Sequence, residues 1–265
     1  MDVLKGMRRL KNVVEVKGVK IGEGAPKLCV PMVGTNEEQL IEEAKTIKEL
    51  PCDLVEWRAD FFQQVVEKEL VVTILEKIRE IISELPIIFT FRNKHEGGHQ
   101  EITPQYYKEL NETVMETGRV DLVDVELFSD AELVEKLVKT GKKNKAAIII
   151  SNHDFQKTPP VEEMTNRMLK AAELGADIAK IAVMPKCAAD VAALQEATRR
   201  LKEEHGVGPL ITMSMGGLGV ITRLSGELFG SDLTFGAASK TSAPGQIAVG
   251  ELRRIIELLH ENMPE

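Results

Sequence analysis

Short apolar runs alternate with longer amphipathic segments along almost the whole chain. Eight runs of six or seven residues are rich in branched apolar residues, as strands buried on both faces are. They lie at 28–33, 53–58, 87–92, 121–127, 146–152, 177–183, 209–214 and 232–237. The segments that follow them repeat apolar positions at helical spacing, which predicts helices. These cover 36–49, 66–84, 103–117, 130–140, 161–174, 188–204, 218–228 and 245–262.

Eight strand–helix units favour a closed parallel (β/α)8 TIM barrel of ~250 residues over a doubly wound sheet. Before the first unit, residues 13–24 read as a β-hairpin that closes the N-terminal end of the barrel. There is no linker or break in composition, so 1–265 is expected to be a single domain, with 1–12 as a disordered tail. Asn36 and Thr103 stand where helix N-caps are expected. Four glycines stand where left-handed helix ends are expected: Gly118, Gly141, Gly175 and Gly206.

Lys180 is the least expected side chain in these runs, because lysine is among the residues least often fully buried. An inward position would disfavour its ammonium form, and a neutral amine attacks carbonyl groups to give a Schiff base. The alternative is an edge-strand lysine, or one that extends its amine to solvent. The apolar run at 176–185, taken alone, favours that alternative.

Other charged residues share the spacing of Lys180 and change this picture. Alternate residues of a barrel strand face the interior. Three acidic and three basic side chains then face one interior: Glu56, Asp124, Glu126, Arg58, Arg92 and Lys180. Charges of both signs can satisfy one another there, whereas a purely structural barrel interior is branched and apolar. The pattern therefore favours a functional Lys180.

His153 ends the fifth predicted strand, and Lys180 lies on the sixth. Sequential strands of this fold are neighbours, and the catalytic end of the barrel is the C-terminal one. An amine that attacks a carbonyl and an imidazole that moves protons form a sensible pair. A strand-end histidine that bonds to backbone is the alternative.

Composition narrows the classes of partner. The 265 residues are 43% hydrophobic and 4% aromatic, with a formal net charge of −8. This balance counts against nucleic acid and anionic membranes, so an anionic substrate needs a local cluster of basic residues. No apolar stretch is long enough to span a membrane. Cys29, Cys52 and Cys187 suggest neither a disulfide framework nor a thiolate metal site, which fits a reducing cytoplasm.

Two motifs invite other interpretations. The segment HEGGH at 95–99 fits the H-E-x-x-H zinc pattern, which requires both histidines on one helix. Paired glycines disfavour helix, so a loop close to a ligand is expected, with Glu96 as a polar partner and no metal. The segment GGLG at 216–219 would suit an anion or a tight turn, and Arg223 beyond it could clamp a carboxylate. Residues 239–246 read as a mobile lid or a long loop.

A set of motifs occurs in order along the chain. They are EWR at 56–58, FTFR at 89–92, EGG at 96–98, DVELF at 124–128, SNHDF at 151–155, KIAVMP at 180–185, ITMSM at 211–215, FGS at 229–231, TFG at 234–236 and SAPGQ at 242–246. Over about 16–260 the chain thus resembles the type I 3-dehydroquinate dehydratases of the shikimate pathway. Pro31 and Lys186 depart from residues that are frequent in relatives.

The resemblance implies the syn dehydration of 3-dehydroquinate to 3-dehydroshikimate. It implies Lys180 as the Schiff-base lysine, His153 as general base and acid, and Glu96 as the carboxylate that orients His153. The substrate would be held by Glu56, Arg58, Arg92, Arg223, Ser242, Gln246, Met213 and Phe235. It implies no metal, nucleotide or organic cofactor, and a homodimer. A class I aldolase and a catalytically silent sensor barrel are the alternatives. Arg223 with the 242–246 segment counts against the aldolase. Retention of Lys180, His153 and Glu96 counts against the sensor.

Overall fold

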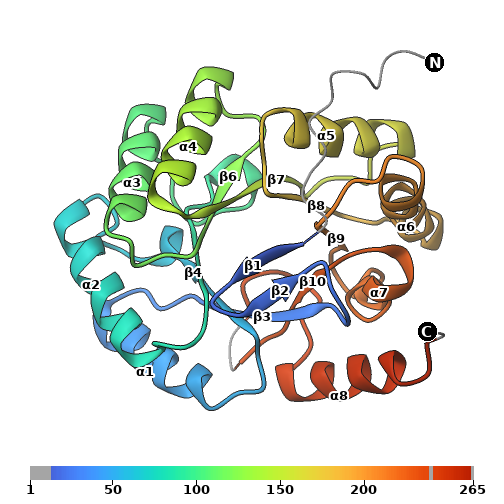
Figure 1. The fold of residues 1–265 in the computed structure, drawn as a ribbon, viewed down its shortest axis with the longest axis horizontal. Helices are drawn as coiled ribbons and strands as arrows, with labels where there is room; N and C mark the ends of the chain where they lie inside the picture. The colour runs from blue at the N-terminus through green and yellow to red at the C-terminus, as the bar shows by residue number, and fades with distance from the viewer. Residues whose placement is uncertain (1–12, 239–240, 264–265) are drawn as a thin grey trace.

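Eight parallel strands form the centre of the molecule. The computed structural model describes residues 13–238 and 241–263, so the predicted tail at 1–12 lies outside the described residues. The sheet has the order β10-β3-β4-β5-β6-β7-β8-β9, and the helices form a ring around it (Figure 1). The predicted (β/α)8 TIM barrel is therefore confirmed.

The predicted strands all overlap observed ones. The strands are β1 Val14–Val16, β2 Val19–Ile21, β3 Lys27–Met32, β4 Leu54–Arg58, β5 Ile87–Thr90, β6 Leu122–Glu126, β7 Ala147–Asp154, β8 Ile178–Val183, β9 Leu210–Ser214 and β10 Leu233–Phe235. The α-helices are α1 Glu37–Lys48, α2 Lys68–Ile81, α3 Pro104–Glu116, α4 Ala131–Asn144, α5 Val161–Glu173, α6 Ala188–Glu203, α7 Gly226–Phe229 and α8 Val249–His260. Short 3-10 turns are η2 Ala59–Phe61, η3 Lys94–Glu96 and η4 Val220–Arg223.

The helix predicted over 218–228 is wrong. That segment is the 3-10 turn η4 followed by the single turn of α7. Thr222 explains the difference, because its hydroxyl donates to Gly219 O at 2.7 Å and accepts from Ser214 N at 3.0 Å. These bonds tie the segment back to the end of β9 in place of a continuous helix. The last helix also begins later than predicted, at Val249.

The helix ends follow the predicted signals with one exception. The side chains of Asn36 and Thr103 accept backbone hydrogen bonds at the starts of α1 and α3, as N-caps do. The prediction for Gly141 is wrong, because Gly141 lies inside α4 and Lys145 is the left-handed residue, with φ 61°. A Cβ on Gly141 would lie 2.6 Å from Ile148 Cδ1, so the glycine allows close packing of α4 on β7. The other predicted caps have positive φ: Gly118, Gly175 and Gly206.

The N-terminal end of the barrel is closed by apolar side chains. Each strand of the barrel contributes one residue to this layer: Cys29, Leu54, Ile88, Leu122, Ile149, Ile178, Ile211 and Leu233. Val14 and Ile21 pair across the β1–β2 hairpin and pack on the layer, as Figure 1 shows by the hairpin drawn across the barrel. The predicted hairpin is confirmed. A second apolar core fills the space between strands and helices.

Aspartates fix the register of the strands at this end. Asp53, Asp121, Asp177 and Asp232 each precede or begin a strand, and each carboxylate accepts a backbone N–H of a neighbouring strand at 2.7–2.9 Å. Near the seam between β9 and β10, Thr212 N also donates to Ser231 Oγ at 2.9 Å. A fixed register determines which side chains face inward. These bonds therefore also fix which side chains face the interior at the opposite, polar end of the barrel.

Candidate active site

Charged side chains fill the barrel above the apolar layer. The inward-facing residues at this level include every one of the six charges predicted to face the interior, and each is at most 7% exposed: Glu56, Asp124, Glu126, Arg58, Arg92 and Lys180. That prediction is confirmed. Because unpaired buried charges are costly, the ion pairs among them decide what the site can do.

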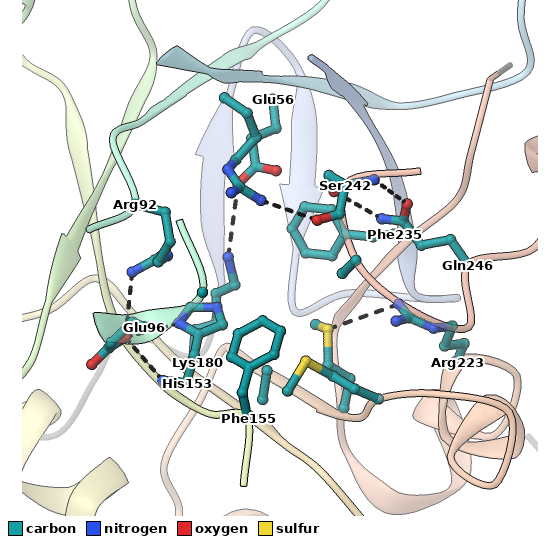
Figure 2. A pocket seen from close by; sticks show the side chains of 16 residues that line it. Glu56, Arg92, Glu96, His153, Phe155, Lys180, Arg223, Phe235, Ser242 and Gln246 are labelled. Carbon is teal, nitrogen blue, oxygen red and sulfur yellow. Dashed lines mark hydrogen bonds and ion pairs between the residues drawn. The ribbon is translucent and has the colours of Figure 1, made fainter. Parts of the chain in front are cut away.

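Lys180 lies in the middle of β8, a strand flanked by β7 and β9. Its side chain is 5% exposed, so the edge-strand and solvent-exposed alternatives are wrong. Nζ donates to Asp124 Oδ2 at 2.9 Å and lies 3.8 Å from Glu56 Oε1. The amine also lies 4.8 Å from the centre of the Phe235 ring. These contacts hold the amine in one position at the wall of the pocket (Figure 2).

Arg92 connects the carboxylates behind Lys180. Its guanidinium contacts Asp124 Oδ1 at 2.6 Å, Glu126 Oε1 at 3.1 Å and Ser151 Oγ at 3.0 Å. Burial disfavours the charged guanidinium, but Asp124 and Glu126 together raise the pKa of Arg92 well above its ordinary value. Burial also opposes ionisation of Asp124, but Arg92 and Lys180 hold its pKa well below the usual range. Asp124 is thus a permanent carboxylate between two cations.

His153 lies beside this cluster on β7 and is held by Glu96. The Glu96 Oε2 atom lies 3.0 Å from His153 Nδ1 and accepts the backbone N–H of the same residue at 2.9 Å. Burial, with the nearby charges of Arg92 and Lys180, lowers the pKa of His153 well below 6.5. The ring is therefore neutral near pH 7, with Nδ1–H donating to Glu96. Nε2 is then left as a proton acceptor.

Glu96 itself titrates near neutrality. Burial raises its pKa to about 7, against the opposing effect of Arg92, whose Nη1 lies 3.5 Å from Oε2. Its position depends on the glycines that follow it. A Cβ on Gly98 would lie 1.8 Å from Arg92 O, so this loop closes tightly on the end of β5.

Arg223 forms the opposite wall of the pocket (Figure 2). It is 1% exposed, and its Nη2 donates to Pro244 O at 3.0 Å. Its Nη1 lies 3.8 Å from Met213 Sδ, and Nε has no hydrogen-bond partner among the described residues. No carboxylate among residues 13–238 and 241–263 pairs with it, and burial lowers its pKa to about 10. An uncompensated buried cation at a pocket is a site for an anion.

The segment at 242–246 contributes Ser242, Ala243 and Gln246 to the wall of the pocket. Ser242 N donates to Gln246 Oε1 at 2.9 Å, and Gln246 Nε2 donates to Ser242 Oγ at 3.1 Å. Arg58 links this segment to the barrel, since it pairs with both carboxylate oxygens of Asp60 at 2.8 Å and lies 3.4 Å from Ser242 O. The mobility predicted for 239–246 stays a prediction, and 239–240 lie outside the described residues.

These walls border about 460 Å³ of space that no atoms fill, part of which is open to solvent. All eleven residues predicted for the site line this space: Lys180, His153, Glu96, Glu56, Arg58, Arg92, Arg223, Ser242, Gln246, Met213 and Phe235. Their placement agrees with the predicted site, and their roles stay predictions. The sequence pattern places Asp124 and Glu126 in the interior without a role, and it does not indicate Asp60, Ser151 or Asn152. Strand spacing could have found Ser151, which shares the side of His153.

Neither of the two motifs that invite other interpretations forms an α-helix. His95 lies in the 3-10 turn η3, and His99 lies in the loop that follows it. The ring of His99 stacks on Phe61, with ring centres 4.9 Å apart. Throughout the described ranges, no group of three His, Cys, Asp or Glu residues could hold a metal ion. Residues 216–219 form a tight turn, in which Gly219 N donates to Gly216 O at 3.2 Å. No described helix is long and apolar enough to cross a membrane.

Several known proteins with high sequence identity to this chain are 3-dehydroquinate dehydratases. The family model "Type I 3-dehydroquinase" matches residues 28–263. The 3-dehydroquinate dehydratase of Bacillus licheniformis is 52% identical over 96% of this chain and 100% of its own length, and that of Listeria monocytogenes is 53% identical over 94% and 99%. A crystal structure of the type I enzyme of Clostridium difficile, with covalent modified comenic acid, has 48% identity and TM-score 0.93, over 96% of this chain and 100% of that one.

Proposed function

Because the chain belongs to the type I 3-dehydroquinase family, we propose that it dehydrates 3-dehydroquinate to 3-dehydroshikimate through a Schiff base on Lys180. One observation carries the mechanism. A buried amine, held at 2.9 Å from Asp124, shares a pocket with a neutral histidine on the adjacent strand. Ser151 and Lys180 are register partners, so His153, two residues further along β7, lies above the amine toward the open end of the barrel.

The first step is attack of Lys180 Nζ on the C3 ketone of the substrate. The amine first passes a proton to the Glu56 carboxylate, 3.8 Å away, because Asp124 stays ionised beside Arg92. That proton moves on to the ketone oxygen as the carbinolamine forms. The carbinolamine then loses water to give an iminium ion. This cation withdraws electrons from C2 and makes the C2 proton acidic, so the enzyme's own amine supplies the activation and no metal or organic cofactor is required.

The second step is proton transfer by His153. Nε2 is the free acceptor, because Nδ1–H is engaged by Glu96 at 3.0 Å. Removal of the C2 proton leaves an enamine, whose electron pair expels the hydroxyl at C1. The imidazolium returns its proton to that hydroxyl, which leaves as water on the same face. Hydrolysis of the remaining iminium releases 3-dehydroshikimate and regenerates Lys180.

The remaining walls orient the substrate. Arg223 would pair with the carboxylate at C1, because this buried guanidinium has no anion of its own among the described residues. Met213 and Phe235, both buried, would pack on the ring. Glu56 and Arg58 would bind ring hydroxyls, Arg92 would stabilise the carboxylates around Lys180, and Ser242 and Gln246 would close over the ligand.

Two further proposals rest on the family resemblance and on the absence of a membrane-spanning helix among the described residues. They are a homodimeric assembly and a cytoplasmic location. Light scattering at micromolar protein concentration, together with cell fractionation, tests them. A monomer in light scattering, or recovery outside the cytoplasmic fraction, contradicts the respective proposal.

One experiment tests the proposed reaction. The protein is mixed with 3-dehydroquinate, and the ultraviolet absorbance of the conjugated enone is followed; a second sample is treated with borohydride and digested. We expect enone formation and an adduct mass on Lys180. Lys180→Ala should lose both, whereas His153→Ala should keep the adduct and lose kcat by roughly 10²–10⁴-fold. Binding without adduct or enone would indicate a sensor, and an adduct with sugar phosphates alone would indicate an aldolase.

A further inference from the structure

Glu96 is held from outside the pocket as well as from inside. Its Oε2 atom receives the two hydrogen bonds of His153 and lies 3.5 Å from Arg92. Its Oε1 atom accepts from Asn152 Nδ2 at 3.1 Å. Asn152 is 4% exposed but does not line the pocket, because it precedes His153 on β7 and points to the other side of the strand.

Arg167 fixes the orientation of the Asn152 amide. Arg167 lies on α5, and its Nη1 donates to Asn152 Oδ1 at 2.7 Å. Guanidinium groups only donate hydrogen bonds, so the amide oxygen must face Arg167 and the NH₂ group must face Glu96. Arg167 is held in turn by Glu163 on its own helix, by the ring of Phe128 at 5.4 Å, and by Asp154 at 4.0 Å.

We propose that Asn152 and Arg167 are positioning residues that act on His153 through Glu96. This inference rests on the proposed role of His153 as the base. The three links run from the surface of the barrel to the base: Arg167 to Asn152 at 2.7 Å, Asn152 to Glu96 at 3.1 Å, and Glu96 to His153 at 3.0 Å. None of them needs the substrate to be present.

The locked amide selects one protonation state of Glu96. A donor at Oε1 stabilises the carboxylate, whereas a protonated Glu96 would need an acceptor for its O–H, and the locked amide offers none on that side. The charged and titratable groups that face Glu96 are Arg92 after β5, Glu126 on β6 and the neutral His153 on β7. Burial and Glu126 raise the pKa of Glu96 toward 7, while Arg92 and the bond from Asn152 lower it. The pKa of Glu96 thus lies near neutral pH, where the single hydrogen bond from Asn152 changes the ionised fraction of the carboxyl group.

The test compares the pH dependence of kcat in three variants. Asn152→Ala and the isosteric Asn152→Asp remove the donor to Glu96, and Arg167→Ala releases the amide. We expect the acidic limb of the profile to move up by about one pH unit, more for Asn152→Asp, so that kcat on that limb falls about tenfold. KM and kcat at high pH should stay within about threefold of the unmodified protein.

Glu163→Gln is the matched control, because it removes a charge partner of Arg167 on its exposed side and leaves the Arg167–Asn152 bond in place. Its profile should be unchanged. An equal loss of kcat at all pH values in both Asn152 variants, an unchanged limb, or the same limb shift in Glu163→Gln would overturn the proposal.

A second measurement is independent of turnover. Carbon-13 NMR of protein labelled at the glutamate carboxyls, with Glu96→Gln to assign the signal, follows the titration of Glu96 in the free protein. Its pKa should rise in folded Asn152→Asp and Arg167→Ala. An unchanged pKa overturns the positioning role of Asn152 and Arg167, even if the proposed reaction stands. If the wild-type protein forms neither the enone nor an adduct on Lys180, the proposed function is overturned instead. The titration of Glu96 then still decides whether Asn152 and Arg167 control its pKa.

Discussion

Replacement of Arg223 by methionine is expected to stabilise the free protein and to destroy its substrate binding. Arg223 is 1% exposed, and within the described ranges its Nε has no hydrogen-bond partner and no carboxylate pairs with it. The guanidinium therefore bears the cost of dehydration without an anion to offset it. Methionine has a comparable length and no polar atom, so it fills the same space without that cost.

The magnitude follows from the effect of burial on Arg223. Burial lowers its pKa from 12.5 to about 10, which corresponds to roughly 3 kcal/mol against the charged form in the folded state. Below about pH 10, Arg223 is protonated in both the folded and the unfolded protein. The whole cost of burying its charge therefore lowers the free energy of unfolding at pH 7. The bond to Pro244 O at 3.0 Å offsets about 1–2 kcal/mol of it. Arg223→Met should therefore raise the free energy of unfolding by about 1–2 kcal/mol.

The same substitution should lower kcat/KM by about 10²–10³-fold. A buried charge pair between guanidinium and substrate carboxylate, when it loses one partner, costs about 2–5 kcal/mol. Urea unfolding followed by circular dichroism measures stability, and enone absorbance measures turnover. Arg253→Met is the matched control, because Arg253 has an internal partner in Asp53 at 2.8 Å, at the apolar end of the barrel. It should lose stability and keep kcat/KM. If Arg223→Met is less stable by 1 kcal/mol or more and keeps kcat/KM within about threefold, the reasoning is wrong.

Three further predictions concern the base and its surroundings. kcat/KM should fall as the pH drops through about 7, because protonation of Glu96 in the free protein removes the acceptor that orients His153; a pH profile of kcat/KM measures this, and a flat profile from pH 5 to 8 would contradict it. Asp124→Asn should lower the free energy of unfolding by about 3 kcal/mol in urea, since it removes a buried anion shared by Lys180 and Arg92. Gly98→Ala should reduce kcat at least about tenfold, because a Cβ 1.8 Å from Arg92 O forces the Glu96 loop to shift; unaltered kinetics would show that the loop adapts.

The strands and the charged interior could be predicted from the sequence for a physical reason. Parallel strands covered by helices are buried on both faces, so they appear as continuous apolar runs, and a charge inside such a run stands out. The period of two along each strand groups its charges on one side, and a helix-covered outer face would tolerate charges even less than the interior does. Together these two points predict that Glu56, Asp124 and Lys180 lie together in the interior. The apolar layer of the hairpin and strands follows from the same alternation.

The contacts that connect the site depend on tertiary distances that no local pattern contains. Asp60 lies beyond the end of β4, and its pairing with Arg58 depends on the turn η2. Asn152 points away from the pocket by its parity, yet it contacts Glu96 because the loop after β5 reaches over β7. The helix predicted at 218–228 failed in the same way, since Thr222 bonds to β9 in place of its own helix. At the C-terminal end of the barrel, tertiary contacts around the pocket override the local preference for a helix.

The pocket is electrically asymmetric, and under the proposed function this asymmetry would account for the choice of substrate. On one side, Lys180 and Arg92 are balanced by carboxylates within hydrogen-bond distance, so that wall offers a nucleophile and a base without net attraction for an anion. On the other side, Arg223 carries a buried positive charge that no described carboxylate neutralises (Figure 2). A ligand with a carboxylate at one end and a ketone at the other can bind favourably in one direction only, with its ketone at Lys180. A neutral sugar gains nothing from Arg223. Under the proposed function, the same charge that weakens the free protein would select the acid and align its carbonyl for attack by Lys180.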